Sequence, residues 1–377
     1  MTRSSDVIII GGGLAGLTCA IHLSIKGMKV LLIEKHPYPK HKVCGEYISN
    51  EVLPYLNALG FDPFEHGATR ITRLTLSTAR SNSITVNLPR GGFGISRYRI
   101  DNELAKLASS KGAKIIRASV QDVNFHENIF KVMTNRGKTY STPLVIGAFG
   151  KRSNLDVHLD REFMSLPAPN LAVKAHYSGV FPDDLVGLHN FKGGYCGVSK
   201  VEDDRINVCY ITDLNAFKKH KNIVTFQQEV MSKNRYLRAA FDHMEMEFKN
   251  PVTISNISFH TKNPVKDHVL MCGDSAGMIH PLAGNGMSMA IRSAQMLSLL
   301  ILKYKSGKIT SRTNLETSYA TQWNESFSTR LRWGRVIEQI FRRNILSEII
   351  LILLKIFPFL LSLIIRNTHG KPMKPEI

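Results

Sequence analysis

Three glycines near the N-terminus have the spacing of a loop that binds a pyrophosphate. Gly11, Gly13 and Gly16 follow an apolar run and open a segment with helical periodicity. The first permits a tight turn, the second lets backbone approach a phosphate, and the third lets the helix pack closely on a strand. Glu34 closes the next apolar run, where a carboxylate can accept hydrogen bonds from ribose hydroxyls. This combination predicts a dinucleotide site. Its other expected contacts are Leu14, Ala15 and Lys35.

A second glycine-rich segment lies far downstream. Gly273 and Asp274 follow another apolar run, and the stretch from His280 to Met287 leads into a further helical segment. An aspartate at a strand end can bind a ribityl hydroxyl, and glycines at a helix start present free N–H groups to an electron-rich ring edge. Asp274 could instead serve only as a helix cap. The two segments together favour a flavin. The expected contacts are Gly273, Asp274, Pro281, Gly284, Gly286 and Met287.

The elements that must position these residues alternate between strand and helix. The sequence predicts a strand over residues 6–10, a helix over residues 14–26 and a second strand over residues 29–33. This order is typical of the start of a doubly wound parallel sheet. Residues 101–111 read as a helix capped by Asp101. We therefore predict an α/β fold, with a Rossmann-like cofactor domain, an interleaved β-sheet substrate domain and C-terminal helices.

The predicted domains follow from where these patterns change. Residues 1–153 form the first part of the cofactor domain and include some strands of the substrate domain. Residues 154–266 form a β-rich substrate domain with one helix near residues 226–240. Residues 267–305 return to the cofactor domain, and residues 306–377 form a C-terminal helical region.

The two glycine-rich segments resemble those of a flavoprotein superfamily. It includes para-hydroxybenzoate hydroxylase-like monooxygenases, flavin-dependent halogenases and geranylgeranyl reductases. The resemblance spans about residues 6–305 and implies an FAD-dependent oxidoreductase. It also implies that Arg97, just before a helix, contacts the cofactor, and that the backbone of Val120 meets the adenine.

Different segments point to different branches of this superfamily. Lys42-Val43-Cys44-Gly45 is similar to the Lys-x-Cys-Gly of geranylgeranyl reductases, in which this loop borders the flavin. Glu46 replaces the second glycine usual there. We expect Cys44 to contact the cofactor or substrate and to donate a proton or shape the pocket; the alternative is a small buried side chain. The segment from His280 to Gly286 is more similar to aromatic and quinone-ring hydroxylases.

The source of electrons stays open. Hydroxylases of this group carry an Asp-Gly pair that helps to bind FAD and NADPH, and Phe149 stands in place of that aspartate. A second dinucleotide loop is not apparent in the sequence. The expected donors are NADPH, NADH or a reduced protein.

Several other residues have two interpretations. Trp323 and Trp333 are wrongly spaced for the Trp-x-Trp-x-Ile-Pro signature of halogenases, which makes that branch a weak candidate. Tyr195 lies in a predicted hairpin and is either a substrate-pocket residue or a core tyrosine. His280 is a candidate catalytic base, but a role in shaping the loop is favoured because no partner for it can be identified.

Charge and cysteine content restrict the partners. The 377 residues carry a formal net charge of +19, spread along the chain, and no nucleic-acid-binding module is recognisable, so we expect no nucleic-acid partner. The charge fits attraction to anionic lipid headgroups, and it fits a basic surface without a specific function equally well. Five cysteines without a Cys-x-x-Cys pair indicate a reducing compartment, hence a cytoplasmic location. Metal-ligand spacing is not apparent, so we expect no metal.

The C-terminal segment from Ile345 to Ile365 is strongly apolar. Glu348, Lys355 and Ser362 recur every seven residues and should lie on one side of a helix, which Pro358 interrupts. This segment is long enough to span a membrane, but its charged stripe and its proline disfavour a membrane span. An ordinary core helix is a further alternative. We favour an interfacial or substrate-channel helix at the inner face of the membrane.

The functional hypotheses follow from these branches. The first is a monooxygenase that hydroxylates a lipophilic aromatic, quinone or polyketide substrate. The alternative is a reductase that saturates prenyl or polyene double bonds. A halogenase and a non-catalytic flavoprotein are the less favoured hypotheses.

Overall fold

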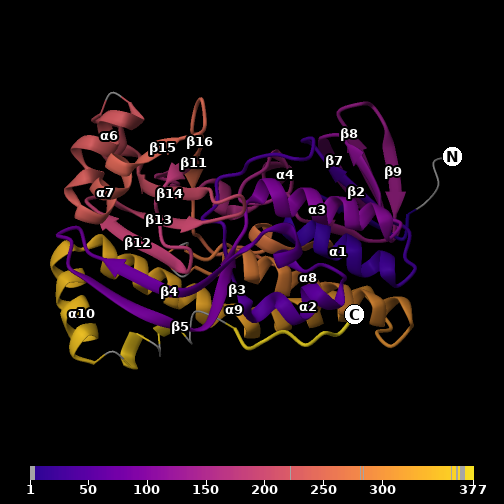
Figure 1. The fold of residues 1–377 in the computed structure, drawn as a ribbon. Coiled ribbons are helices and arrows are strands. Elements are labelled where there is room, and N and C mark those ends of the chain that lie inside the picture. The colour runs from indigo at the N-terminus through magenta and orange to yellow at the C-terminus, as the bar shows by residue number, and fades with distance from the viewer. Residues whose placement is uncertain are drawn as a thin grey trace.

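The computed structural model describes residues 5–220, 222–280, 282, 284–357, 359–361, 364–365 and 370–377. Pro281, Pro358 and Ser362, which the sequence singles out, lie outside the described residues. The expected α/β architecture is confirmed, with parallel and antiparallel sheets and C-terminal helices (Figure 1).

A mostly parallel six-stranded sheet forms the core of the cofactor domain. Its strand order is β17-β18-β10-β1-β2-β6, and β17 is the antiparallel edge strand. The central strand β1 is completely apolar and buried, because helices cover both faces of such a sheet. The strands are β1 (Val7–Ile10), β2 (Val30–Glu34), β6 (Lys114–Arg117), β10 (Val145–Gly147), β17 (Val265–Lys266) and β18 (Val269–Met271). The helices packed together beside it are α1 (Leu14–Ile25), α3 (Arg97–Ser110) and α8 (Gly286–Lys305).

A larger sheet forms the other half of the molecule. Its order is β15-β11-β14-β13-β12-β4-β5-β3, and β16 pairs with β11. Strands from two distant parts of the chain meet where β4 pairs in parallel with β12. The strands are β3 (Tyr47–Ser49), β4 (Thr69–Ser77), β5 (Ser83–Gly94), β11 (Asn170–Gly179), β12 (Leu185–Phe191), β13 (Gly194–Lys200), β14 (Ile206–Asp213), β15 (Met244–Met246) and β16 (Val252–Ile257). The predicted substrate domain therefore also includes residues 47–94.

Smaller elements complete the two halves. A three-stranded sheet consists of β7 (Val120–His126), β8 (Ile129–Thr134) and β9 (Thr139–Thr142). Short helices are α2 (Leu53–Ala58), α4 (Asn154–His158), α5 (Leu214–Lys218), α6 (Ile223–Glu229) and α7 (Arg235–His243). The long helix α9 (Arg312–Arg342) leads to α10 (Asn344–Ile356), which lies against the large sheet beside β5, at the lower left of Figure 1.

Two helix predictions are wrong in their boundaries. The helix α3 begins at Arg97 rather than at Asp101, because the Ser96 side chain caps it by accepting a hydrogen bond from Arg99 N. The single helix predicted near residues 226–240 is divided into α6 and α7. Asn234 caps the N-terminus of α7 by accepting a hydrogen bond from Tyr236 N. This asparagine cap divides a segment whose periodicity predicts a single helix.

The C-terminal segment also differs in detail from the expected stripe. Glu348 is buried, and its carboxylate accepts a hydrogen bond from Asn82 Nδ2 at 2.6 Å. Lys355 is exposed. Among the helices that the structure describes, none is both long and apolar enough to cross a membrane.

Candidate cofactor and substrate site

The N-terminus of α1 forms the predicted phosphate cradle. Gly13 precedes the helix, and among the described residues no side chain caps it, so its first N–H groups can bind an anion. A Cβ on Gly11 would lie 2.3 Å from Ala148 O, and one on Gly16 would lie 2.0 Å from Gly11 O. Close packing therefore requires these two glycines. A Cβ on Gly13 would meet only Arg97 Nη2 at 3.4 Å, so this glycine leaves space for a ligand.

Glu34 lies at the end of β2 beside this cradle. One carboxylate oxygen accepts a hydrogen bond from Gly12 N at 2.6 Å, and the other accepts from His36 N at 2.9 Å. The Tyr38 hydroxyl donates to Gly12 O at 2.7 Å and fixes the same turn. The carboxylate is thus held where the sequence predicts contact with a ribose.

One cavity of about 1380 Å³ joins the residues predicted from both glycine-rich segments. Gly16 and His280 do not line it, and Pro281 lies outside the described residues. The predicted residues on its wall are Gly11, Gly13, Leu14, Ala15, Glu34, Lys35, Cys44, Arg97, Val120, Tyr195, Gly273, Asp274, Gly284, Gly286 and Met287. The structure therefore brings together almost the whole predicted site.

The two glycine-rich segments lie side by side on the cavity wall, because α1 packs against α8 and Gly273 lies against Ala15. Among the described residues no side chain caps α8 either, so N–H groups at its first turn are available to a ligand. Two open helix N-termini, at Gly13 and Gly286, and a carboxylate at each strand end match an elongated cofactor with an anionic middle. The residues present fit FAD.

Arg97 is fixed over the cradle by an anchor that the sequence analysis missed. Its guanidinium donates two hydrogen bonds of 2.8 Å to Asp101, and Lys42 Nζ donates to the same carboxylate at 2.8 Å. Burial alone would raise the pKa of Asp101, but the charges of Arg97 and Lys42 hold it below its ordinary value. Asp101 was predicted as a helix cap, and its observed partner is this arginine one helical turn earlier. That spacing was the available signal.

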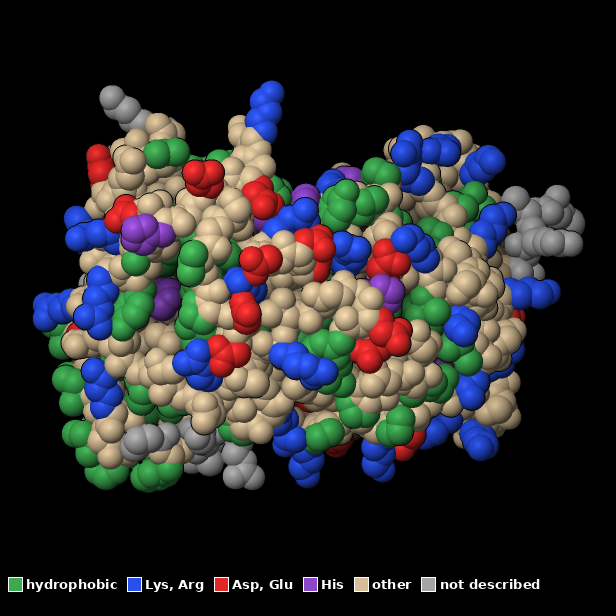
Figure 2. Space-filling model, in the orientation of Figure 1, with side chains coloured by type: hydrophobic (Ala, Val, Ile, Leu, Met, Phe, Trp, Pro, Cys, Tyr) green, Lys and Arg blue, Asp and Glu red, His purple; other side chains and the backbone are tan. Residues whose placement is uncertain are grey.

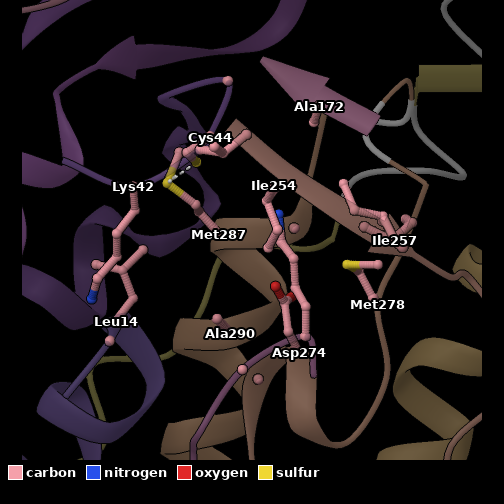
Figure 3. Close-up of a pocket in the computed structure, with 18 of the residues that line it drawn as sticks. Leu14, Lys42, Cys44, Ala172, Ile254, Ile257, Asp274, Met278, Met287 and Ala290 are labelled. Atoms are coloured by element: carbon pink, nitrogen blue, oxygen red, sulfur yellow. Dashed lines mark hydrogen bonds between the residues drawn. The ribbon is translucent and has the colours of Figure 1, made fainter. Parts of the chain in front are cut away.

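Cys44 lies between the cofactor domain and the large sheet. Its thiol donates to Met287 Sδ at 3.5 Å, and its backbone carbonyl accepts from Asn207 Nδ2 on β14 at 3.2 Å. Figure 3 shows Cys44 and Met287 pointing toward each other, with Ile257 and Met278 beyond them on the far side of the same space. All five cysteines are free. The Cys44 thiol is therefore on the wall of the cavity and available to a bound molecule.

Glu46, two residues further on, forms a buried ion pair that the sequence analysis did not predict. Its backbone has a positive φ of 54°, a conformation in which glycine is usual. Its carboxylate accepts from Lys174 Nζ at 2.8 Å, from His176 Nε2 at 2.7 Å and from Arg97 N at 2.8 Å. The replacement of a glycine by a carboxylate was the sequence signal, but its partners on β11 could not be read from it.

His280 lies in an apolar environment behind the residues that line the cavity. Its ring centroid lies 4.5 Å from that of Phe259 and 5.8 Å from that of Tyr195. Burial, with a smaller contribution from Arg342, lowers the pKa of His280 to about 3. Its Nδ1 accepts a hydrogen bond from Leu282 N at 3.4 Å. The ring is neutral at physiological pH and supports the loop rather than facing the cavity.

The part of the cavity away from the cradle is apolar. Strands of the large sheet form one side of it, and α9, α10 and the residues after α10 form the other. Its aliphatic and aromatic lining includes Leu74, Leu76, Leu88, Val186, Leu188, Ile337, Ile340, Phe341, Ile350, Leu354, Leu361, Ile364 and Ile365. Such a compartment excludes water and binds hydrocarbon. Within the described residues there is no cluster of side chains suited to a metal ion.

Comparison with known proteins agrees with this geometry. A family model described as "FAD binding domain" matches residues 4–321. A digeranylgeranylglycerophospholipid reductase of Methanosphaera stadtmanae is 27% identical over 308 residues, covering 75% of this chain and 71% of the relative. A menaquinone reductase of Mycobacterium tuberculosis is 25% identical over 189 residues, 48% of this chain and 46% of the relative.

Solved structures share the fold at low sequence identity. A flavin-dependent brominase superposes with a TM-score of 0.81 and 18% identity, covering 97% of this chain and 93% of that one. PqsL of P. aeruginosa, bound to 2-aminobenzoylacetate, has a TM-score of 0.76 and 14% identity, covering 91% and 98%. These likenesses establish the architecture and leave the reaction to other arguments.

Proposed function

From the premise that this chain belongs to the FAD binding domain family, and is thus an FAD-dependent oxidoreductase, we propose that it reduces carbon–carbon double bonds in a lipophilic prenyl or polyene substrate. The observation that carries the proposal is the position of Cys44. This thiol lies where the cofactor half of the cavity meets the apolar half. A hydrocarbon chain in the apolar half would therefore reach the flavin past Cys44.

Different residues of this chain would contribute to different parts of the reduction. Gly13, Glu34, Arg97 and Gly286 would hold FAD, which would supply hydride for the double bond once a donor such as NADPH, NADH or a reduced protein had reduced it. The Cys44 thiol, which contacts Met287 while Asn207 holds the Cys44 backbone carbonyl, can give its proton to the other carbon and regain one from solvent. The aliphatic walls orient the substrate and exclude water.

Two further observations support reduction. The relatives of this chain include digeranylgeranylglycerophospholipid reductases and menaquinone reductases, whose names describe lipophilic substrates. His280, the alternative acid–base candidate, lies off the cavity wall and is uncharged at physiological pH. Cys44 is therefore the better-placed proton donor.

A mass measurement of the product tests the reaction type. The purified holoprotein, chemically reduced with dithionite, is incubated with geranylgeranylated glycerophospholipid, without oxygen and under ¹⁸O₂. We expect a product that gains two hydrogen atoms per reduced double bond in both atmospheres. A product that gains labelled oxygen, and only when O₂ is present, would overturn the proposal.

A pair of cysteine variants tests the proton donor. Cys44→Ala should lower turnover about a hundredfold or more, the usual contribution of a positioned acid, while FAD stays bound. Cys209→Ala is the matched control because Cys209 also lines the cavity and, like Cys44, is half-buried. Equal activity of the two variants would remove Cys44 from the mechanism.

Monooxygenation is the second candidate, and the start of α8 supports it. The backbone at Gly284 and Gly286 lines the cavity next to Asp274, an arrangement that the sequence shares with ring hydroxylases. A lipophilic aromatic or quinone ring would occupy the space beside Tyr195. The ¹⁸O₂ experiment separates this candidate from reduction directly.

A further inference from the structure

Helix α10 carries apolar side chains on two opposite faces. On the inner face, Leu351 and Leu354 are buried against β4 and β5, and Leu354 also lines the cavity with Ile350. The outer face has no covering element in the part of the chain that the structure describes, and its side chains are 44–73% exposed. It consists of Ile345, Ile349, Ile352, Leu353 and Ile356, and Phe359 continues it.

The charges around the outer face are positive. Glu348 is the only acidic residue of α10, and it is buried where it accepts the hydrogen bond from Asn82. Arg343 and Lys355 are exposed. Arg235 of α7 is also exposed, and its backbone N–H binds Ser81 in the β4–β5 turn next to Asn82. Figure 2 shows hydrophobic side chains along the lower left edge, over α10, with Lys and Arg side chains among them.

We propose that this outer face docks on an anionic lipid bilayer. An exposed apolar helix face bordered by cations is the arrangement that lies in a membrane interface. The 13 residues of α10 extend about 20 Å, which is shorter than the hydrocarbon core and suits a helix lying flat. A second copy of this chain is a poorer occupant, because a net charge of +19 opposes self-association and attracts anionic headgroups.

The docked orientation would serve the reaction. This step rests on the proposed function, whereas the docking itself does not. Since the inner face of the same helix lines the apolar half of the cavity, α10 would separate the bilayer from the substrate compartment by the width of one helix. A lipid substrate would then move from the membrane along α10 to Cys44 without crossing water.

Vesicle sedimentation of the full-length holoprotein tests the docking without any turnover. The probes are phosphatidylcholine vesicles with and without 30% phosphatidylglycerol. We expect the wild type to bind the anionic vesicles and to be released by high salt. The double variant Ile352→Glu/Ile356→Glu should bind at least tenfold more weakly, because it places two carboxylates on the outer face.

A matched control uses the same substitutions elsewhere on the surface. Val180 and Val224 are 86% and 56% exposed and lie outside α10, so Val180→Glu/Val224→Glu should bind like the wild type. Unchanged vesicle binding by the α10 variant would overturn the proposal. So would a wild-type dimer in analytical ultracentrifugation that only the α10 variant converts to monomer. The proposed function fails separately, if reduced holoprotein leaves detergent-dispersed substrate unchanged.

Discussion

Nε2 of His176 lies 2.7 Å from a carboxylate oxygen of Glu46, a residue 130 positions earlier in the chain. The second oxygen of Glu46 binds Lys174 Nζ and Arg97 N. One buried carboxylate thus connects the Cys44 loop to β11 and to the first turn of α3. The loop that borders the predicted flavin site is thereby fixed to the large sheet.

The first prediction concerns the stability that this ion pair provides. Glu46→Gln leaves the ammonium group of Lys174 buried without a counter-charge, so the free energy of unfolding should fall by about 3 kcal/mol. Urea denaturation of the holoprotein measures it. The control is Glu103→Gln, whose partner Lys106 is exposed, and it should change stability by less than about 1 kcal/mol. Equal losses would show that the Glu46 pair contributes no more than a surface pair.

The second prediction concerns acid stability. Burial would raise the pKa of Glu46, but Lys174 and His176 lower it below its ordinary value of 4.5, and the pKa of Asp101 is likewise below 3.8. The unfolded chain then binds these protons more readily than the folded one. The stabilisation is present above the ordinary values and is lost as the pH falls through the lower, folded values.

Thermal unfolding measured from neutral pH down to about pH 3 tests this direction. The melting temperature of the wild type should fall steeply in the acid range. Glu46→Gln should start lower and fall less, because it no longer has this carboxylate to protonate. A parallel decline in both proteins would contradict the assignment of acid sensitivity to Glu46.

The phosphate cradle could be predicted from the sequence because its parts are local. Gly11, Gly13 and Gly16 lie close together in the sequence, and the strand and helix that they connect follow from short-range patterns. The second glycine-rich segment could be added because its family pattern is equally short. Both segments lie on one cavity, as expected from a sheet whose strand ends meet at the same edge.

The parts of the fold and of the site that the sequence did not predict depend on contacts between distant segments of the chain. The partners of Glu46 come from a strand more than a hundred residues away, and no local pattern specifies which carboxylate meets which lysine. The inner and outer faces of α10 are both apolar, so hydropathy alone cannot tell which one packs on β5. The start of α3 was missed because Ser96 outcompetes Asp101 as a cap.

The third prediction separates two roles of glycine in the cradle. Gly16→Ala places a Cβ 2.0 Å from Gly11 O, so backbone must move and the free energy of unfolding should fall by about 1–3 kcal/mol even without FAD. Gly13→Ala meets only Arg97 Nη2, at a contact distance of 3.4 Å, so stability should change by less than about 1 kcal/mol. The methyl group added at position 13 instead enters the space expected for the FAD phosphates. FAD affinity, measured by flavin fluorescence, should fall about tenfold or more.

A fourth prediction uses Arg97 and a neighbour on the same helix. Arg97→Met removes a half-buried cation that points at the cradle, and FAD affinity should fall about tenfold to a hundredfold. Arg99→Met is the control, since Arg99 is bound to Asp203 on the surface and does not line the cavity. If both variants bind FAD like the wild type, the arginine serves only to anchor Asp101.

The last prediction concerns the size of the apolar compartment. Gly197 on β13 lines the cavity, and a Cβ there would lie 3.6 Å from Leu188 Cδ2 and 3.7 Å from Cys209 O, which is ordinary contact. Gly197→Phe should therefore fold and bind FAD normally, while its ring occupies substrate space. KM for a long prenyl substrate should rise at least tenfold, and that for a short-chain analogue should rise less.

Gly197→Ala is the matched control because it adds only the Cβ that the structure accommodates. Steady-state kinetics of the three proteins with both substrates, together with their flavin spectra, measure the effect. An equal loss on long and short substrates would mean that the ring disturbs the flavin region rather than the chain-binding region. Unchanged kinetics in Gly197→Phe would place the hydrocarbon away from β13, and substrate would then have to approach Cys44 from the Ile257 and Met278 side of the cavity.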